Sequence, residues 1–343
     1  TYKLHSLGDY VRTIIAFGTT DSYSTQTGEL EHRRVKRFYA RTNKKNATIQ
    51  IARLDRRERA LWHIRNKPEN HRYPLRHSQR PRTAARLSPE EALDQHHIIS
   101  RTVNSPVYLF PWLKQQHVGD PAIANFLPKL RNHLLVRLRN PDEADAGVVY
   151  SPSDLNEIII VGDRIYSHAT MRVNYTTYDM QRSYDSLSVK RHADVMTLSP
   201  DHDANTGTTP SGHPFMYRRI LGIYHVEVRY NKRGQPPTSH RMEFLWVRNY
   251  CRDTTFKAGL QHRRFHRISF APNSDSDAFT FLDPDEVIRA VHLIPAFSHG
   301  RTSDWCQGPT MARTGEDDWR YFYVNFFVDR DMYMRYAGDG IGH

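Results

Sequence analysis

Basic side chains between residues 31 and 82 carry the clearest chemistry in this sequence. The stretch holds seventeen Lys or Arg residues and four acids, so its excess of +13 is larger than the +12 of the whole chain. Lys and Arg displace counterions from phosphates, and this charge density is far above that of a solvated helix face. We therefore predict nucleic-acid contact here, through ten cations: Arg33, Arg34, Lys36, Arg37, Arg41, Lys44, Lys45, Arg56, Arg57 and Arg59.

This stretch is expected to position phosphates and to read few bases, because it lacks the Asn or Gln spacing of a recognition helix. Two other interpretations use the same residues. In one they form a solubilising surface. In the other they dock an acidic partner, and a polyacidic protein would then bind as well as DNA.

Other residue types with chemical potential are read as structural. His96 and His97 are adjacent, which on a helix turns them about 100° apart, and no second ligand pair follows at the usual spacing, so we do not expect a metal there. Short acidic clusters have the composition of turns and helix N-caps. They are Asp201/Asp203, Asp275/Asp277 and Asp283/Asp285/Glu286.

Several site classes lack their motifs. The chain has no phosphate-binding Gly-x-x-x-x-Gly-Lys-Ser/Thr loop, no Gly-x-Ser-x-Gly and no His-Glu-x-x-His. Its two cysteines, Cys251 and Cys306, exclude a four-cysteine zinc site and are read as ordinary thiols. The aromatic run at 321–327 is expected to form the core face of a strand.

Composition describes a polar protein with enough aromatic residues to fold. Hydrophobic residues make up 38% and aromatic residues 11% of the 343 positions. No apolar run approaches the roughly 18 residues of a membrane span, and the opening Thr-Tyr-Lys-Leu-His does not resemble a signal sequence. We expect a soluble intracellular protein whose partner is a polyanion, with no membrane and no small-molecule substrate.

The elements that must position these residues divide into a helical half and a β-rich half. Helical spacing of apolar residues predicts helices at 7–17, 29–39 and 46–67, so residues 1–67 form a basic helical segment. Residues 68–88, rich in Pro, Arg and His, are predicted to be a flexible basic linker. Residues 89–140 are predicted to be a helical connector, with a helix over 120–139 that Pro128 kinks or splits.

After residue 140 the sequence is dominated by short β-like runs. Strands are predicted at 157–161, 164–173, 219–229, 241–250, 265–270 and 321–328. We expect an α+β protein whose residues 157–343 form a β-rich, barrel-like domain. Alternate apolar positions are expected to line a shared core, and these are Tyr224, Val226, Val228, Phe244, Trp246 and Ile268.

Four segments together resemble a known family. They are 17–39, the string Arg172-Val-Asn-Tyr-Thr-Thr-Tyr-Asp179, 283–297 and 319–335. Nearly the whole chain resembles the C-terminal region of CACTA-like DNA transposases abundant in fungi, a group that includes the Plavaka elements and is related to Kyakuja, Dileera and Zisupton. The β-rich part also resembles a domain that follows the core in plant CACTA transposases, for which a small five-stranded barrel that binds a partner or DNA is suitable.

The resemblance implies an RNase H-like core in which three carboxylates hold Mg²⁺ or Mn²⁺ for strand cleavage. Residues 1–67 would then be the tail of that core, and Glu29 would be the third acid and a metal ligand, with Glu31 as the nearby rival. The alternative is that Glu29 is an acid that favours the start of a helix. No upstream strand in this chain supplies the first two carboxylates, so we expect no cofactor and no complete reaction in the isolated chain.

Three functions remain open from the sequence. The first is the nucleic-acid-binding C-terminal portion of a nuclear DNA transposase, which would contact DNA and the upstream transposase core or another protein. The second is a non-catalytic, domesticated module that binds protein or RNA. The third is a degraded transposon remnant.

Overall fold

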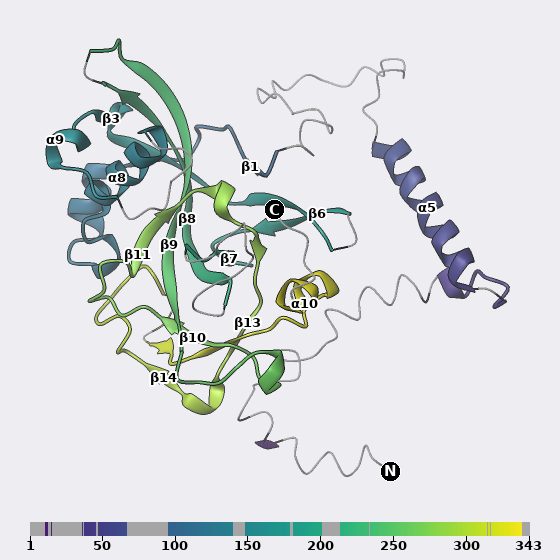
Figure 1. Ribbon diagram of the computed structural model, residues 1–343. Coiled ribbons are helices and arrows are strands. Elements are labelled where there is room, and N and C mark those ends of the chain that lie inside the picture. The colour runs from purple at the N-terminus through teal and green to yellow at the C-terminus, as the bar shows by residue number, and fades with distance from the viewer. Residues whose placement is uncertain are drawn as a thin grey trace.

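The computed structural model describes residues 11, 12, 15, 36, 38–45, 47–66, 95–139, 148–178, 181–200, 213–232, 234–313, 315 and 317–337, without the side chains of 55 and 58–66. Long antiparallel strands dominate, with helices against them, so the α+β class is confirmed (Figure 1). None of the described helices combines the length and apolarity needed to cross a lipid bilayer.

Helix α5 (Ala47–Asn66) confirms the predicted basic helix at 46–67. Figure 1 draws it apart from the sheets. Its sequence carries five arginines, and Gln50 in its first turn accepts a hydrogen bond from the Asn43 backbone N–H at 3.0 Å and donates one to the Lys45 carbonyl at 2.6 Å. The loop 41–45 is therefore fastened to the start of the helix.

The largest sheet is organised around one long hairpin, β8 (Phe215–Tyr230) and β9 (Thr238–Arg252). Along one path its strand order is β12 (Arg289–Ala290), β7 (Asp194–Leu198), β8, β9, β10 (Arg267–Phe270), β16 (Phe322–Val324) and β13 (Leu293–Pro295). Off this path, β11 (Phe279–Leu282) pairs with β9, β3 (Ile158–Ile160) and β4 (Arg164–His168) pair with β8, and β2 (Pro106–Tyr108) pairs with β4.

Two smaller sheets complete the strand topology. One has the order β1 (His97–Ile99), β5 (Met171–Thr176), β6 (Arg182–Leu187), and the other pairs β14 (Arg301–Thr302) with β15 (Asp318–Trp319). Within the part of the chain that the structure describes, the large sheet starts at β12 and ends at β13 without closing, and no closed barrel is found.

Short helices join and cover the strands. They are α7 (Leu109–Pro111), η2 (Trp112–Gln116), η3 (Pro121–Ile123), α8 (Phe126–Arg139), α9 (Pro152–Leu155), η5 (Val161–Asp163), η6 (Leu260–His262), η7 (Pro284–Glu286), η8 (Phe297–His299) and α10 (Arg330–Ala337). The expected connector at 89–140 thus contains the strands β1 and β2 as well as helices. The predicted helix at 120–139 is split at Ala124 and Asn125 and not at Pro128, which lies in the first turn of α8, where a missing N–H costs nothing.

Most of the predicted strands are present with different ends. The runs 157–161, 219–229, 241–250 and 265–270 correspond to β3, β8, β9 and β10. The run 164–173 is two strands, β4 and β5, with a turn between them. The aromatic run forms only the three-residue β16, because the Asn325 side chain accepts a hydrogen bond from the Phe327 N–H at 3.0 Å and turns the chain.

A β-bulge in β8 lies between Ile220 and Gly222. The Tyr224 ring lies directly over Gly222, in the space that a Cβ would take. Only glycine permits this approach, so the bulge and the buried Tyr224 depend on each other.

The predicted core residues are all buried, but they do not share one core. Five of them line a cluster between the β8–β9 hairpin and helix α8, together with Leu130 and Leu134. The sixth, Ile268, is buried in a separate cluster with Phe270 and Phe322, where β10 meets β16. The expectation of a single shared core was therefore wrong for Ile268, because residues of β7, β8 and β9 form a second cluster with β10 and β16.

Candidate functional site

The structure places six of the ten predicted DNA contacts. Lys36, the three cations of the loop 41–45, and Arg56 and Arg57 of α5 are all exposed. Arg59 lies on α5, but its side chain is outside the described ones, and Arg33, Arg34 and Arg37 lie outside the described residues. Arg53 of α5 is also exposed and was not among the predicted contacts.

We use the name basic surface for seven exposed cations of this segment: Lys36, Arg41, Lys44, Lys45, Arg53, Arg56 and Arg57. Backbone and side-chain hydrogen bonds hold the loop in one turn: the Lys44 N–H donates to the Thr42 hydroxyl at 3.3 Å and the Lys45 N–H to the Asn43 side chain at 3.0 Å. Among the described side chains, none of the seven cations forms an ion pair.

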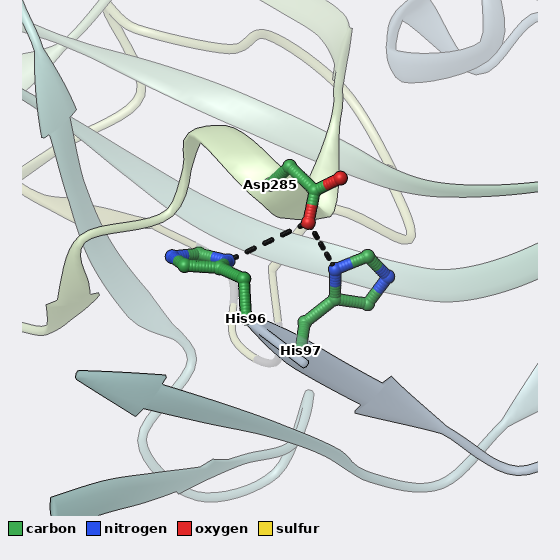
Figure 2. A group of neighbouring side chains, drawn as sticks. All are labelled: His96, His97 and Asp285. Carbon is green, nitrogen blue, oxygen red and sulfur yellow. Dashed lines mark hydrogen bonds and ion pairs between the residues drawn. The ribbon is translucent and has the colours of Figure 1, made fainter. Parts of the chain in front are cut away.

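A second cluster joins β1 to the large sheet, and sequence reasoning missed it. His97 Nδ1 lies 2.6 Å from Asp285 Oδ1, and its Nε2 lies 3.0 Å from Glu243 Oε2. His96 Nδ1 lies 3.6 Å from the same Asp285 oxygen. Figure 2 shows the Asp285 carboxylate between the two imidazole rings. We call His96, His97, Asp285 and Glu243 the histidine–carboxylate cluster.

Three elements distant in sequence position this cluster. His97 is held in β1 by antiparallel pairing with Val173 of β5, and Glu243 belongs to β9. Asp285 lies in the short helix η7, whose N-cap Asp283 accepts the Asp285 backbone N–H at 3.1 Å. The interpretation of Asp283 as a capping residue is confirmed, and the cap fixes the turn that presents Asp285.

Arg241 and Arg137 hold the carboxylates of Glu243 and Asp283 in place. Arg241 donates to Glu243 Oε1 at 2.9 Å and to the Ser100 carbonyl at 3.1 Å, so one guanidinium holds both the acid and the end of β1. Arg137 of α8 donates to the Glu243 carbonyl at 2.6 Å and forms an ion pair with Asp283. The cluster is therefore built on rigid elements.

Charge in the cluster is strongly coupled. Burial lowers the pKa of His97, but the hydrogen bonds that it donates to Asp285 and Glu243, together with their negative charges, outweigh this effect and raise the pKa to about 9. The nearby imidazoles, first His96 and then His97, hold the pKa of Asp285 well below its usual range. Burial raises the pKa of Glu243, yet the hydrogen bonds from His97 and Arg241 outweigh it and lower that pKa. At neutral pH, without a metal, His97 is an imidazolium between two carboxylates.

A pocket of about 530 Å³ lies beside the cluster. Its lining residues are Gln95, His96, His97, Ile98, Ile99, Arg101, Glu243 and Asp285. Two imidazoles and one carboxylate can supply a nitrogen- and oxygen-donor set to a divalent ion, and the pocket leaves room for water or another ligand.

No family model, curated protein or solved structure matches this chain. The transposase resemblance therefore stays an expectation from the sequence segments, and Glu29 with its rival Glu31 lies outside the described residues. Among the described residues, one group of His, Cys, Asp or Glu brings three ligand atoms together, and it is His96, His97 and Asp285.

From the sequence, no metal is expected at His96 and His97 because adjacent residues on a helix point about 100° apart. The pair stands at the start of a strand, where neighbouring side chains are set by β-sheet pairing, and its third group comes from 188 residues further along. No sequence spacing signals that partner. The one local signal is the capping segment Asp283-Pro-Asp-Glu, which fixes a turn but says nothing about what the turn faces.

The remaining predicted structural roles have mixed outcomes. Asp275 accepts the Asp277 backbone N–H at 2.9 Å, which confirms a turn, and Asp201 and Asp203 lie outside the described residues. In the aromatic run, Phe322 and Phe326 are buried, which confirms their core role, while Phe327 is exposed. Cys251 and Cys306 are free thiols, as expected.

Proposed function

We propose that this chain is the nucleic-acid-binding C-terminal portion of a CACTA-like DNA transposase, and that the basic surface contacts phosphates. The observation that carries the proposal is a cluster of exposed cations, without ion pairs among the described side chains, on a loop fastened to a helix. In this proposal the β-rich part packs on the upstream core or recruits a partner. Cleavage requires that core, with Glu29 supplying one carboxylate to Mg²⁺ or Mn²⁺.

The shape of the basic surface suits duplex DNA. A helix of 20 residues is about 30 Å long, close to one turn of the duplex, over which phosphates recur on both strands. Arg53, Arg56 and Arg57 are spaced three to four residues apart and reach one side of the helix. The loop fastened to its first turn adds Arg41, Lys44 and Lys45.

None of the described side chains of helix α5 is buried. Its first turn contains no acid, and Ile49 is 58% exposed. In this proposal, contact with a polyanion adds stabilisation to the helix. An acidic protein offers the same charge, so the experiment must separate the two.

The test replaces six of the predicted contacts together by Gln and titrates duplex DNA at 50 and 200 mM salt. The six are Lys36, Arg41, Lys44, Lys45, Arg56 and Arg57. If each contacts one phosphate at about −0.9 per contact, the variant loses about 5 from the slope of log affinity against log salt. Between 50 and 200 mM salt, six phosphate contacts lower the wild-type affinity by roughly 10³-fold. The variant is expected to lose this part of the salt dependence.

The matched control removes the same charge from the β-rich part. It replaces six exposed cations there by Gln: Lys190, Arg191, Arg229, Lys232, Lys257 and Arg263. We expect it to keep the wild-type slope. An unchanged slope and affinity in the first variant would place the contact elsewhere. Competition by polyglutamate as strong as by DNA would favour an acidic-protein dock, and preference for RNA would favour the second function.

A further inference from the structure

The histidine–carboxylate cluster has the donors and the spacing of a metal site. One ring nitrogen each of His96 and His97 and one carboxylate oxygen of Asp285 all lie within 4.8 Å of one another. In a tetrahedral site with bonds of about 2.0–2.1 Å, ligand atoms stand about 3.3 Å apart. The observed separations of 2.6 and 3.6 Å from Asp285 Oδ1 to the two nitrogens lie on either side of that value. Small side-chain rotations would bring all three onto one ion.

His96 supplies an independent sign that the cluster is incomplete. Its Nδ1 is buried from solvent and has no hydrogen-bond partner among the described residues. It points at the Asp285 carboxylate, as Figure 2 shows, but stays beyond hydrogen-bond distance. A buried nitrogen without a partner is costly, and a metal ion would satisfy it.

Glu243 lies in the position of the carboxylate that accepts the second N–H of a metal-bound histidine. A metal-ligating imidazole donates its other N–H to a carboxylate, which fixes the ring and increases its basicity. His97 makes this contact through Nε2, and Arg241 in turn holds Glu243. The ring is therefore already oriented with Nδ1 toward Asp285 and His96.

A purely structural explanation accounts for part of this arrangement only. An imidazolium between Asp285 and Glu243 would join β1 to the large sheet without a metal, and it explains His97. It accounts less well for His96, whose Nδ1 lies 3.6 Å from the same carboxylate, within ion-pair distance but beyond hydrogen-bond distance. It does not explain why Asp285, whose side chain is 64% exposed, remains open to the pocket.

We propose that His96, His97 and Asp285 bind one divalent first-row transition metal ion, with Glu243 as the carboxylate behind His97 and the pocket at the open fourth position. Two imidazoles with one carboxylate suit Zn²⁺ and its neighbours better than Mg²⁺, which prefers oxygen. The ion takes the place of the Nδ1 proton of His97, which passes to solvent. The site is separate from the basic surface and from the Glu29 chemistry, and it does not depend on the proposed function.

The test is metal binding by the full chain after treatment with a chelator. Zn²⁺ alone is titrated by calorimetry, and Co²⁺ is added in parallel because a tetrahedral site gives it intense visible absorption. We expect one tight equivalent of Zn²⁺ and a rise in Tm on binding. His96→Ala and Asp285→Asn are expected to weaken Zn²⁺ binding by at least about 100-fold, and Glu243→Gln by about 10- to 100-fold.

Matched variants separate this site from adventitious binding by the other histidines. His262→Ala removes an exposed histidine, and Asp304→Asn removes a carboxylate that is 61% exposed, close to the 64% of Asp285. Both are expected to leave binding unchanged. The proposal is overturned if no one-to-one binding is measured, if His96→Ala binds like the wild type, or if His262→Ala weakens binding as much as His96→Ala. A far-UV spectrum identical to wild type shows that each variant is folded.

Discussion

Trp246 packs strand β9 against η2 and helix α8. Its side chain is 1% exposed and makes edge-to-face contacts with Trp112, at 5.9 Å between ring centroids, and with Phe126, at 5.6 Å. It thus joins the sheet to η2 and α8 in one aromatic group. Replacing it by Ala removes the centre of that group and leaves a cavity that the surrounding strands are too rigid to fill.

The expected cost is set by burial and by the ring contacts. A tryptophan that buries roughly 200–250 Å² contributes about 5–6 kcal/mol at 25 cal/mol per Å², which is an upper bound because the unfolded chain also buries area. Large-to-small substitutions of buried aromatics cost about 3–5 kcal/mol. We expect Trp246→Ala to lower the free energy of unfolding by 3–5 kcal/mol on this basis.

The measurement is urea unfolding followed by far-UV circular dichroism. Phe327→Ala is the control, since its side chain is 45% exposed, and we expect a cost below about 1 kcal/mol. A double-mutant cycle with Trp112→Ala should give a coupling of about 0.5–1.5 kcal/mol. If Trp246→Ala costs less than about 1 kcal/mol with an unchanged m value, the described aromatic group does not stabilise the fold and the reasoning fails.

Two further predictions concern buried charge. Asp318 bonds Arg248 at 3.0 and 2.7 Å inside the protein, so Asp318→Asn should cost about 3–5 kcal/mol in urea unfolding, and the Arg248→Met/Asp318→Leu double variant should recover most of it. Burial lowers the pKa of His213 to about 3, so its neutral form stabilises the fold above pH 6.5. This stability should fall by on the order of 3 kcal/mol between pH 6.5 and 4, and His213→Phe should remove that loss.

The parts of the fold that were predicted are those whose signal is local. The strands β8 and β9 are long runs of β-branched and aromatic residues, and their apolar alternation survives any error in the ends. The short strands β1 and β2 have three residues each, too few for a period to be seen. They form because β5 and β4 supply backbone hydrogen-bond partners, and the residues next to β1 and β2 in the sequence give no sign of this pairing.

The barrel-like expectation shows the same limit at the level of topology. A barrel needs the last strand of a sheet to pair with the first, and here the large sheet ends in β12 and β13, of two and three residues. Both follow η7 in the chain, yet β12 pairs with β7 and β13 with β16. Such pairings between distant segments decide whether a sheet closes, and they cannot be predicted from composition.

The two candidate sites differ in what the sequence could show of them, and for one physical reason. Phosphate contact is a sum over many weakly positioned charges, so charge density along the chain is sufficient to predict it. A metal site depends on a few atoms held within fractions of an ångström, so its evidence lies in the fold, where η7 brings Asp285 to His96 and His97. The same contrast predicts how each responds to mutation. Single neutralisations in the basic surface should each change the salt slope by about 1, whereas one ligand removed from the cluster should abolish tight binding.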